Sequence, residues 1–314
     1  MPVAVCALSH SPLIGFNHPA KAVEKRVEMA FDQARSFIAE FDPNLVVLFA
    51  PDHYNGFFYD MMPQFCIGTH ATALGDYNTP AGELSVAKSA RTMAKDVLAA
   101  GIDIAVSERM YVDHGFSQPL QILFDGLDKV PVVPIFINSV ATPLCPVGRI
   151  RQLGTAVGHA SAHIAEQRVL FLGSGGLSHD PPVPQLENAT EEVAARLIDG
   201  RNPTPEERAR RQARVIASGL ELAAGTSSMR PINPEWDRQF LDLISAGELQ
   251  HVDAWDNAWF AEQAGNSSHE VRTWIAAYAA MAARGNYVIN YRFYEPVPEW
   301  VAGFAVTTAV SADA

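Results

Sequence analysis

Four histidines stand at the ends of short apolar segments, where their side chains could bind a metal or move protons. His10 closes "ALSH", His53 closes "APDH", His114 stands in "VDHGF" and His179 closes "GSGGLSH". Neutral imidazole coordinates borderline metals, and an imidazole that titrates near neutral pH accepts or donates protons. A single histidine in such a position could instead be held by backbone hydrogen bonds in a tight turn. Four of the chain's ten histidines placed alike favour a shared site.

One acidic residue near the C-terminal end of the chain could complete a metal site. Glu270 stands in "SSHEVRTW", where a long helix is expected to begin. Its position three residues after Ser267 also fits a capping box, a purely structural interpretation. The alternative is that the helix start presents Glu270 to a metal beside two histidines. Such a facial triad leaves three positions open, enough for a bidentate substrate and dioxygen on ferrous iron, whereas zinc sites commonly keep one position for water.

Other sequence patterns that could indicate a metal site, a nucleotide-binding site or a catalytic nucleophile are weak in this sequence. His159 and His163 have the i, i+4 spacing of a helical metal pair, but HExxH is missing, and a solvated helix face is the better interpretation. "GSGGLS" matches neither GxGxxG nor a P-loop, and it is not a GxSxG nucleophile elbow. Its glycines are expected to let the backbone turn sharply and place His179 in a pocket.

The apolar segments before these histidines are typical of strands buried on both faces. They are VAVCAL (3–8), LVVLFA (45–50), VVPIFI (132–137) and VLFL (169–172), with "DIAVSERMYV" (103–112) as a shorter candidate before His114. Residues 19–41 repeat apolar side chains at helical spacing, and a second amphipathic segment runs from Leu84 to Val97 and ends before Gly101. This alternation predicts a three-layer α/β/α domain with a largely parallel or mixed central sheet. Ligands bind at the carboxyl ends of such strands.

The pattern changes after Pro181 to charged helices without intervening strands. "LENATEEVAARLIDG" and "PTPEERARRQARVIASGLELAAG" are expected to pack over the sheet or its open end, as a lid or an oligomer contact. Additional C-terminal helices are predicted at "NPEWDRQFLDLI" and over about 268–283, and "YVINYRFYEPVPEW" is expected to supply late strands. No repeat or flexible linker divides the chain. We therefore predict one domain over residues 1–314, with a helical elaboration at about 181–230.

Charge and cysteine content exclude several classes of protein. Lys and Arg number 23 against 35 Asp and Glu, and the net charge of -12 disfavours nucleic acid and anionic membrane surfaces as partners. An anionic substrate would need a local basic group, which the spacing does not identify. Cys6, Cys66 and Cys145 are too few and too scattered for a disulfide framework or a zinc-thiolate site, and they fit a reducing cytoplasm. Without a signal peptide or a long enough apolar segment, the protein is expected to be soluble.

Several longer segments together resemble a known family. They are "LSHSP", "FAPDHYNGFFYDMMPQFCIG", "VDHGFSQPL", "PVVPIFIN", "LFLGSGGLSHDPP", "NPEWDRQF", "SSHEVRTW" and the final "PVPEWVAGF". Their order is that of the protocatechuate 4,5-dioxygenase-like (class III) extradiol ring-cleavage dioxygenases, and the similarity covers nearly the whole chain. Within this family, the chain is most similar to members that open catechols carrying a three-carbon acid side chain.

The resemblance implies a specific site and reaction. His10, His53 and Glu270 would bind Fe(II), and His114 and His179 would form an acid/base pair in which His179 is the base. The substrates would be a catechol and dioxygen, with cleavage beside the two hydroxyls giving a 2-hydroxy-6-oxo-diene acid. Homo-oligomers are common in the family. Two rival functions stay open, a zinc-dependent hydrolase at the same metal site and a non-catalytic metal-binding or assembly protein.

Overall fold

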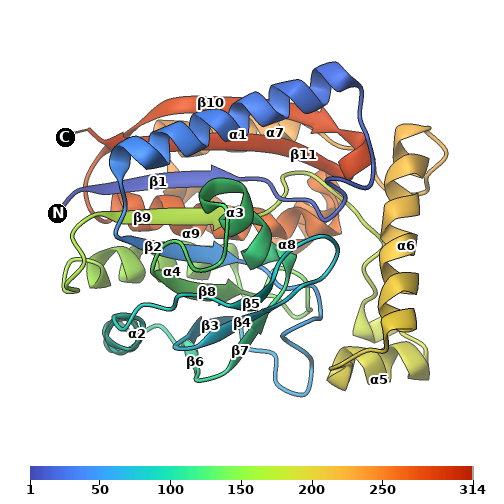
Figure 1. Ribbon diagram of the computed structural model, residues 1–314, viewed down its shortest axis with the longest axis horizontal. Coiled ribbons are helices and arrows are strands. Elements are labelled where there is room, and N and C mark those ends of the chain that lie inside the picture. Colours follow the sequence, from blue (N-terminus) through green and yellow to red (C-terminus); the bar gives the residue numbers. More distant parts are fainter. Residues whose placement is uncertain (313–314) are drawn as a thin grey trace.

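Four fully buried strands form the parallel centre of the sheet. β1 (Val3–Leu8), β9 (Val169–Ser174), β2 (Leu45–Ala50) and β8 (Val132–Ile137) lie side by side in this order in the computed structural model, which describes residues 1–312. Every residue in them is buried, which explains why the sequence shows no polar alternation. All four predicted strands are confirmed, and they point toward the end of the molecule where α5 and α6 lie (Figure 1).

Further strands extend this sheet on both sides. β11 (Ala302–Ser311) pairs antiparallel with β1, and β10 (Tyr287–Val297) pairs antiparallel with β11. On the other side, β3 (Phe65–Gly68) runs antiparallel to β8, and β6 (Ala105–Ser107) runs parallel to β3. The result is an eight-stranded mixed sheet, and the late strand expected in the aromatic C-terminal segment is confirmed.

Helices cover both faces of the sheet, which confirms the three-layer α/β/α prediction. α1 (Lys21–Phe41) and α3 (His114–Phe124) pack on one face. α2 (Ala90–Ala99), α4 (Val147–Ala160) and α9 (Val271–Ala282) pack on the other. Alternate side chains of β1 enter the two cores in turn, as expected for a strand between two helical layers.

The structure of residues 103–112, which precede His114, differs from the single strand that the sequence predicts. Residues 103–112 form two short strands in different sheets, because β7 (Met110–Val112) joins β4 (Ala71–Leu74) and β5 (Ala81–Glu83) in a separate three-stranded sheet. His114 therefore does not follow a strand of the main sheet. It is the first residue of α3, where the Asp113 carboxylate caps the helix.

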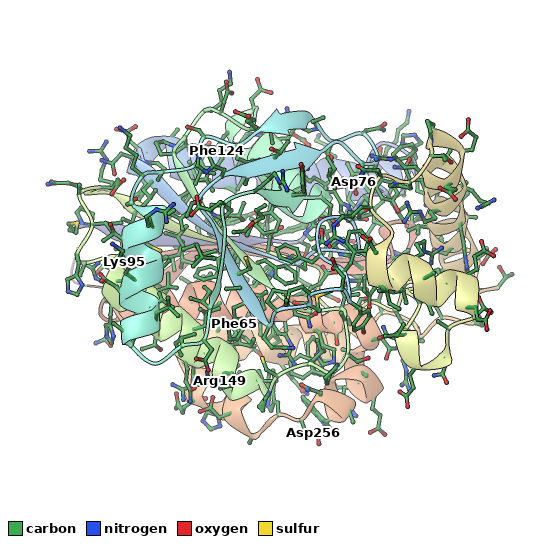
Figure 2. All side chains as sticks on the ribbon, turned by 90° about the horizontal axis from the view of Figure 1, so that it is seen from below. Phe65, Asp76, Lys95, Phe124, Arg149 and Asp256 are labelled. Atoms are coloured by element: carbon green, nitrogen blue, oxygen red, sulfur yellow. The ribbon has the colours of Figure 1, made fainter. Side chains whose placement is uncertain are left out.

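Charged helices stand beyond the carboxyl ends of the parallel strands. α5 (Glu191–Asp199) and α6 (Pro205–Ala223) lie at this end of the molecule, as predicted for an element over the open end of the sheet (Figure 1). Figure 2 shows Asp76 at the same end and Lys95 of α2 near the other end. The remaining elements are α7 (Pro234–Ala246), α8 (Asn257–Ala264) and 3-10 turns at Leu186–Asn188, Leu249–Ala254, Asn266–Glu270 and Pro298–Trp300. Within residues 1–312, no helix is both long and apolar enough to cross a bilayer.

Two glycines of α4 allow α9 to pack closely against it. A Cβ atom added to Gly154 would lie 2.3 Å from the carbonyl oxygen of Ala276, and one added to Gly158 would lie 2.3 Å from that of Ala280. Distances this short to backbone atoms can be relieved only by moving a helix. The pair therefore determines how near α9 lies to α4 and, with it, where Glu270 at the start of α9 is placed.

We expect Gly158→Ala to lower the free energy of unfolding by about 1–3 kcal/mol, because the added methyl group would push α9 away from α4. Urea unfolding followed by circular dichroism measures the change. Gly148→Ala in the same helix is the control, since its added Cβ would meet only the Asp253 side chain at 3.1 Å. Equal stability of the two variants would contradict the proposed role of close helix contact.

Candidate active site

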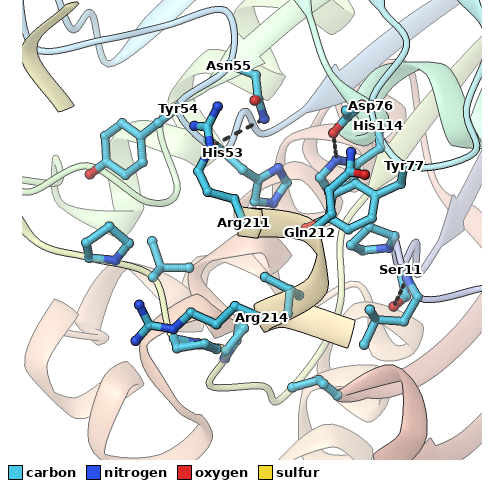
Figure 3. Close-up of a pocket in the computed structure, with 18 of the residues that line it drawn as sticks. Ser11, His53, Tyr54, Asn55, Asp76, Tyr77, His114, Arg211, Gln212 and Arg214 are labelled. Atoms are coloured by element: carbon cyan, nitrogen blue, oxygen red, sulfur yellow. Dashed lines mark hydrogen bonds and ion pairs between the residues drawn. The ribbon is translucent and has the colours of Figure 1, made fainter. Parts of the chain in front are cut away.

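All five residues singled out in the sequence line one cavity at the carboxyl ends of the parallel strands. His10, His53, His114, His179 and Glu270 border a cavity of about 440 Å³ (Figure 3). Four of them are buried and His53 is half-buried. The sequence therefore predicted correctly that these distant residues meet.

Glu270 lies among three of the histidines. Its Oε1 atom is 3.0 Å from His53 Nε2 and 3.1 Å from His179 Nε2, and its Oε2 atom is 3.7 Å from His10 Nε2. The carboxylate is 3 % exposed, so the nitrogen atoms of these imidazoles take the place of water around it. A buried carboxylate faced by several nitrogen donors is a typical arrangement of a metal site.

The capping-box interpretation of Glu270 is wrong. The backbone N–H of Ser267 donates to the carbonyl of His179, and Glu270 Oε2 accepts a 2.9 Å hydrogen bond from Gly176 N–H. A Cβ atom on Gly175 would lie 2.7 Å from Glu270 Cβ. Gly175 is thus required by the close approach of Glu270, a tertiary contact that differs from the predicted sharp turn.

Side chains of α9 fasten its first turn to the end of β9. Thr273 Oγ1 donates to the carbonyl of Ser174 at 2.8 Å, and Trp274 Nε1 donates to the carbonyl of Gly175 at 2.9 Å. Both side chains are fully buried. The position of Glu270 is therefore set by packing and hydrogen bonds on the strand that precedes His179.

Hydrogen bonds determine which nitrogen of His10 carries the proton. Ser174 Oγ donates its one hydrogen to the carbonyl of Gly115 at 2.8 Å, so it accepts from His10 Nδ1–H at 2.8 Å. The Nε2 atom of His10 then carries a lone pair directed toward Glu270. Burial lowers the pKa of His10 to about 3, which keeps this imidazole neutral and able to bind a metal.

His53 is oriented by a buried carboxylate behind it. His53 Nδ1 lies 3.0 Å from Asp113 Oδ2, which also accepts from the His53 backbone N–H at 2.9 Å. Burial disfavours the charged imidazolium, but Asp113 and Glu270 outweigh it and raise the pKa of His53 well above its usual value. A histidine that donates Nδ1–H to a carboxylate and aims Nε2 into a site has the orientation of a metal ligand.

His114 forms a buried pair with Asp76, a residue that the sequence analysis missed. His114 Nδ1 hydrogen-bonds to Asp76 Oδ2, and both side chains are almost fully buried. Burial opposes the imidazolium, yet Asp76 and Asp113 raise the pKa of His114 above its usual value. The His114 ring stacks on His53 with centroids 4.4 Å apart. Asp76 lies in a loop after β4, where no spacing pattern distinguishes it.

His179 is held in one tautomer by its own turn. Its Nδ1 atom lies 2.7 Å from the carbonyl oxygen of Leu177, which can only accept, so Nδ1 carries a hydrogen. The Nε2 atom faces Glu270. Burial opposes protonation, but Glu270 raises the pKa of His179 above its usual value. Burial likewise opposes ionisation of Glu270, but His179 and His53 hold the pKa of this carboxyl well below its usual range.

Helices α5 and α6 supply the opposite wall of the cavity. Arg196 of α5 and Arg208, Arg211 and Arg214 of α6 all line it, together with Tyr77 from the loop after β4. Figure 3 shows Arg211 and Arg214 leaving α6 in different directions. The cavity thus has a wall of imidazoles with the carboxylates of Asp76 and Glu270, facing a wall of guanidinium groups.

The chain offers more than one possible donor set for a metal. Nitrogen atoms of His10, His53 and His114 lie within 4.8 Å of one another, and Glu270 lies within 3.7 Å of His10 and 3.0 Å of His53. Two neutral imidazoles with a carboxylate suit a divalent ion that keeps open positions. The remaining histidines could then transfer protons to or from a bound molecule.

The histidines and cysteines set aside in the sequence lie away from this cavity. His159 is exposed on the last turn of α4, and His163 is exposed three residues beyond the end of this helix, with Nδ1 3.2 Å from Asp96 Oδ2. Both side chains are solvated, but only His159 lies on the predicted helix. Cys6, Cys66 and Cys145 are free thiols, and the first two are buried in the core.

Comparisons with known proteins identify close relatives. Residues 4–305 match the family described as the catalytic LigB subunit of aromatic ring-opening dioxygenases. A 2,3-dihydroxyphenylpropionate/2,3-dihydroxicinnamic acid 1,2-dioxygenase of Rhodococcus sp is 60% identical over 314 residues, covering 100% of both chains. The protein of the same name from Rhodococcus jostii (strain RHA1) is 59% identical over the same length, again covering 100% of both chains. One from Paraburkholderia phymatum is 51% identical over 310 residues, covering 98% of each.

We expect Ser174→Ala to move the proton of His10 from Nδ1 to Nε2. The variant removes the acceptor of Nδ1–H, while the Glu270 carboxylate lies 3.7 Å from Nε2 and can accept in its place. Nitrogen-15 NMR of the histidine rings in the metal-free protein measures the two tautomers. Ser139→Ala is the control, because Ser139 is buried and donates to Ile137 O. An unchanged His10 tautomer in Ser174→Ala would contradict the assignment.

Proposed function

The chain belongs to the family of catalytic LigB subunits of aromatic ring-opening dioxygenases, and from this premise we propose which catechol it opens and how. It is an extradiol dioxygenase that acts on a catecholic substrate and dioxygen. The proposed substrate is 2,3-dihydroxyphenylpropionate, with 2,3-dihydroxycinnamate as a second, as in the names of relatives that are 50–60% identical. The product would be a 2-hydroxy-6-oxo-dienedioate, which contains both atoms of dioxygen.

Members of this family depend on a metal, and the proposed ion is Fe(II) held by His10, His53 and Glu270. The observation that supports this assignment is that both imidazoles place Nε2 near one buried carboxylate. His179 Nε2 lies near the same carboxylate, and the resemblance to the family assigns it to proton transfer instead. His114 is a weaker candidate for a metal ligand because its ring stacks on that of His53, with only 15° between the two planes. The lone pair of an imidazole nitrogen lies in the plane of its ring. Two stacked rings therefore direct their lone pairs side by side and not at one ion.

The donor set fits ferrous iron. Two nitrogen donors and one carboxylate on one face leave positions for both diol oxygens and for dioxygen. When bound, the ion would hold the two reactants together and pass electron density between them. The chain's own contribution is to fix the tautomers of His10 and His53 through Ser174 and Asp113.

His179 and His114 are the proposed proton-transfer residues. His179 carries a hydrogen on Nδ1, so in the neutral ring Nε2 is the nitrogen that would take a proton from a catechol hydroxyl as the diol binds. His114 is paired with Asp76, which raises its pKa and suits it to return a proton as the ring opens. Asp76 acts as a positioning residue for this acid.

We further propose that the whole chain acts as one catalytic domain, with residues of about 181–230 as a helical elaboration. The three free thiols support a reducing compartment, the cytoplasm. The assembly is proposed to be a homo-oligomer, which light scattering on the purified protein would test.

Oxygen uptake tests the proposed function directly. We expect protein reconstituted anaerobically with Fe(II) to consume one dioxygen per 2,3-dihydroxyphenylpropionate and to form a yellow product. Removal of the iron with a chelator should abolish uptake. The zinc-hydrolase alternative predicts activity without oxygen, and a non-catalytic metal-binding protein predicts no turnover at all. Either result would contradict the proposal.

Two histidine variants separate metal binding from proton transfer. We expect His179→Gln to retain iron but to lose about 10²- to 10⁴-fold in kcat, because only a proton acceptor is removed. His53→Ala should lose iron and activity together. Metal analysis and oxygen uptake on both proteins measure the two effects. Full activity in His179→Gln, or an iron-replete and active His53→Ala, would overturn the corresponding role.

A further inference from the structure

The wall of the cavity opposite the histidines carries an unusual concentration of positive charge. Its only lysine or arginine side chains are Arg196, Arg208, Arg211 and Arg214, within the described residues 1–312. The chain as a whole has a net charge of -12. A local excess of guanidinium groups in an acidic protein is therefore a feature of this cavity and not of the general surface.

None of these four arginines forms a direct ion pair within the described residues, although the charge of Glu207 on α6 acts on Arg211 and raises its pKa. In the part of the chain that the structure describes, seven other arginines form ion pairs, and none of these pairs involves Arg196, Arg208, Arg211 or Arg214. Arg196, Arg208 and Arg211 are half-buried, whereas Arg214 is exposed. Cations partly withdrawn from water without a counter-ion are unfavourable. An anionic ligand would relieve this cost.

Arg211 is linked to the reacting end of the cavity through Tyr77. It is close enough to Tyr77 for the two groups to affect each other's ionisation, and the Tyr77 ring contacts the His114 ring edge-on with centroids 5.3 Å apart. In the view of Figure 3, the Arg211 side chain extends from α6 in the direction of His53 and Tyr54. Tyr77 thus lies beside the proposed acid and within the electrostatic range of Arg211.

The electrostatic surroundings of Arg211 favour an anion. Burial lowers the pKa of Arg211, the neighbouring Arg196 and Arg208 lower it further, and Glu207 and Tyr77 offset only part of this effect. Arg208 and Arg211 are one helical turn apart, so they lie on the same face of α6. A carboxylate between these groups would accept bidentate hydrogen bonds from a guanidinium and offset the mutual repulsion.

We propose that Arg211, flanked by Arg208 and Arg196, binds the side-chain carboxylate of the substrate and so selects catechols that carry an acid side chain. The inference rests on the proposed function, because it assumes that the diol lies against the histidines and Glu270. The three-carbon side chain then crosses the cavity toward α6. Arg211 is a binding and specificity residue and takes no part in proton transfer.

A pair of substrates that differ only in charge tests this role. For 2,3-dihydroxyphenylpropionate, we expect Arg211→Met to lower kcat/KM by about 10- to 100-fold, mainly through a higher KM. For 3-propylcatechol, which has a methyl group in place of the carboxylate, kcat/KM should be unchanged. Arg211→Lys should lie between wild type and Arg211→Met. The matched control is Arg210→Met, since Arg210 is exposed on α6 and does not line the cavity.

A binding measurement separates this inference from the proposed reaction. 3-Phenylpropionate has the carboxylate but no diol, so calorimetry on the metal-free protein reports the carboxylate site alone. We expect its Kd to rise about 10-fold or more in Arg211→Met and to stay unchanged in Arg210→Met. If wild type binds 3-phenylpropionate through Arg211 but opens no catechol, the proposed function fails and the carboxylate site stands.

Three results would overturn the assignment to Arg211. The first is an equal loss of kcat/KM for both catechols in Arg211→Met, which would indicate a role in folding or chemistry. The second is unchanged KM for the acid substrate together with unchanged binding of 3-phenylpropionate. The third is a larger acid-specific loss in Arg208→Met or Arg196→Met than in Arg211→Met.

Discussion

The site depends on one buried negative charge. The Glu270 carboxylate lies between the ends of β9 and α9, where burial without compensation would cost several kcal/mol. Its neighbours meet this constraint, since Gly176 donates a backbone N–H and the imidazoles of His10, His53 and His179 surround the two oxygens. A divalent ion at the same place would satisfy the carboxylate more strongly than neutral imidazoles can. The arrangement of the histidines follows from the need to serve this one group.

A second layer of acceptors gives each histidine a different task. Each of the four histidines hydrogen-bonds through Nδ1 to a different acceptor. The acceptors are the Ser174 hydroxyl, the carboxylates of Asp113 and Asp76, and the carbonyl of Leu177. All four rings therefore turn Nε2 away from these acceptors, but the pKa values of the rings differ. The pKa of His10 is depressed by burial, whereas that of His114 is raised by two carboxylates despite burial. Ring identity alone does not predict such differences, because they come from the burial of each ring and from the carboxylates that the fold places beside it.

The sequence predicted the four central strands and the meeting of His10, His53 and His179 because both depend on local patterns. Apolar strands followed by histidines place those histidines at one edge of a parallel sheet. It did not predict the separate small sheet that precedes His114, because strands of three or four residues leave little periodicity. It also missed Asp76, whose role arises only when a loop folds against α3. The capping alternative for Glu270 failed for the same reason, since a tertiary contact with Gly176 overrode a local spacing.

Helices α5 and α6 form one wall of the cavity without contributing any of the five residues assigned to metal binding or proton transfer. Chemistry and molecular recognition are thus encoded in separate stretches of polypeptide. Substitutions confined to α5 and α6 should then change which ring substituents are accepted while the reactive end of the cavity stays intact. A related chain could acquire a new substrate in this way without rebuilding the residues that carry out the reaction.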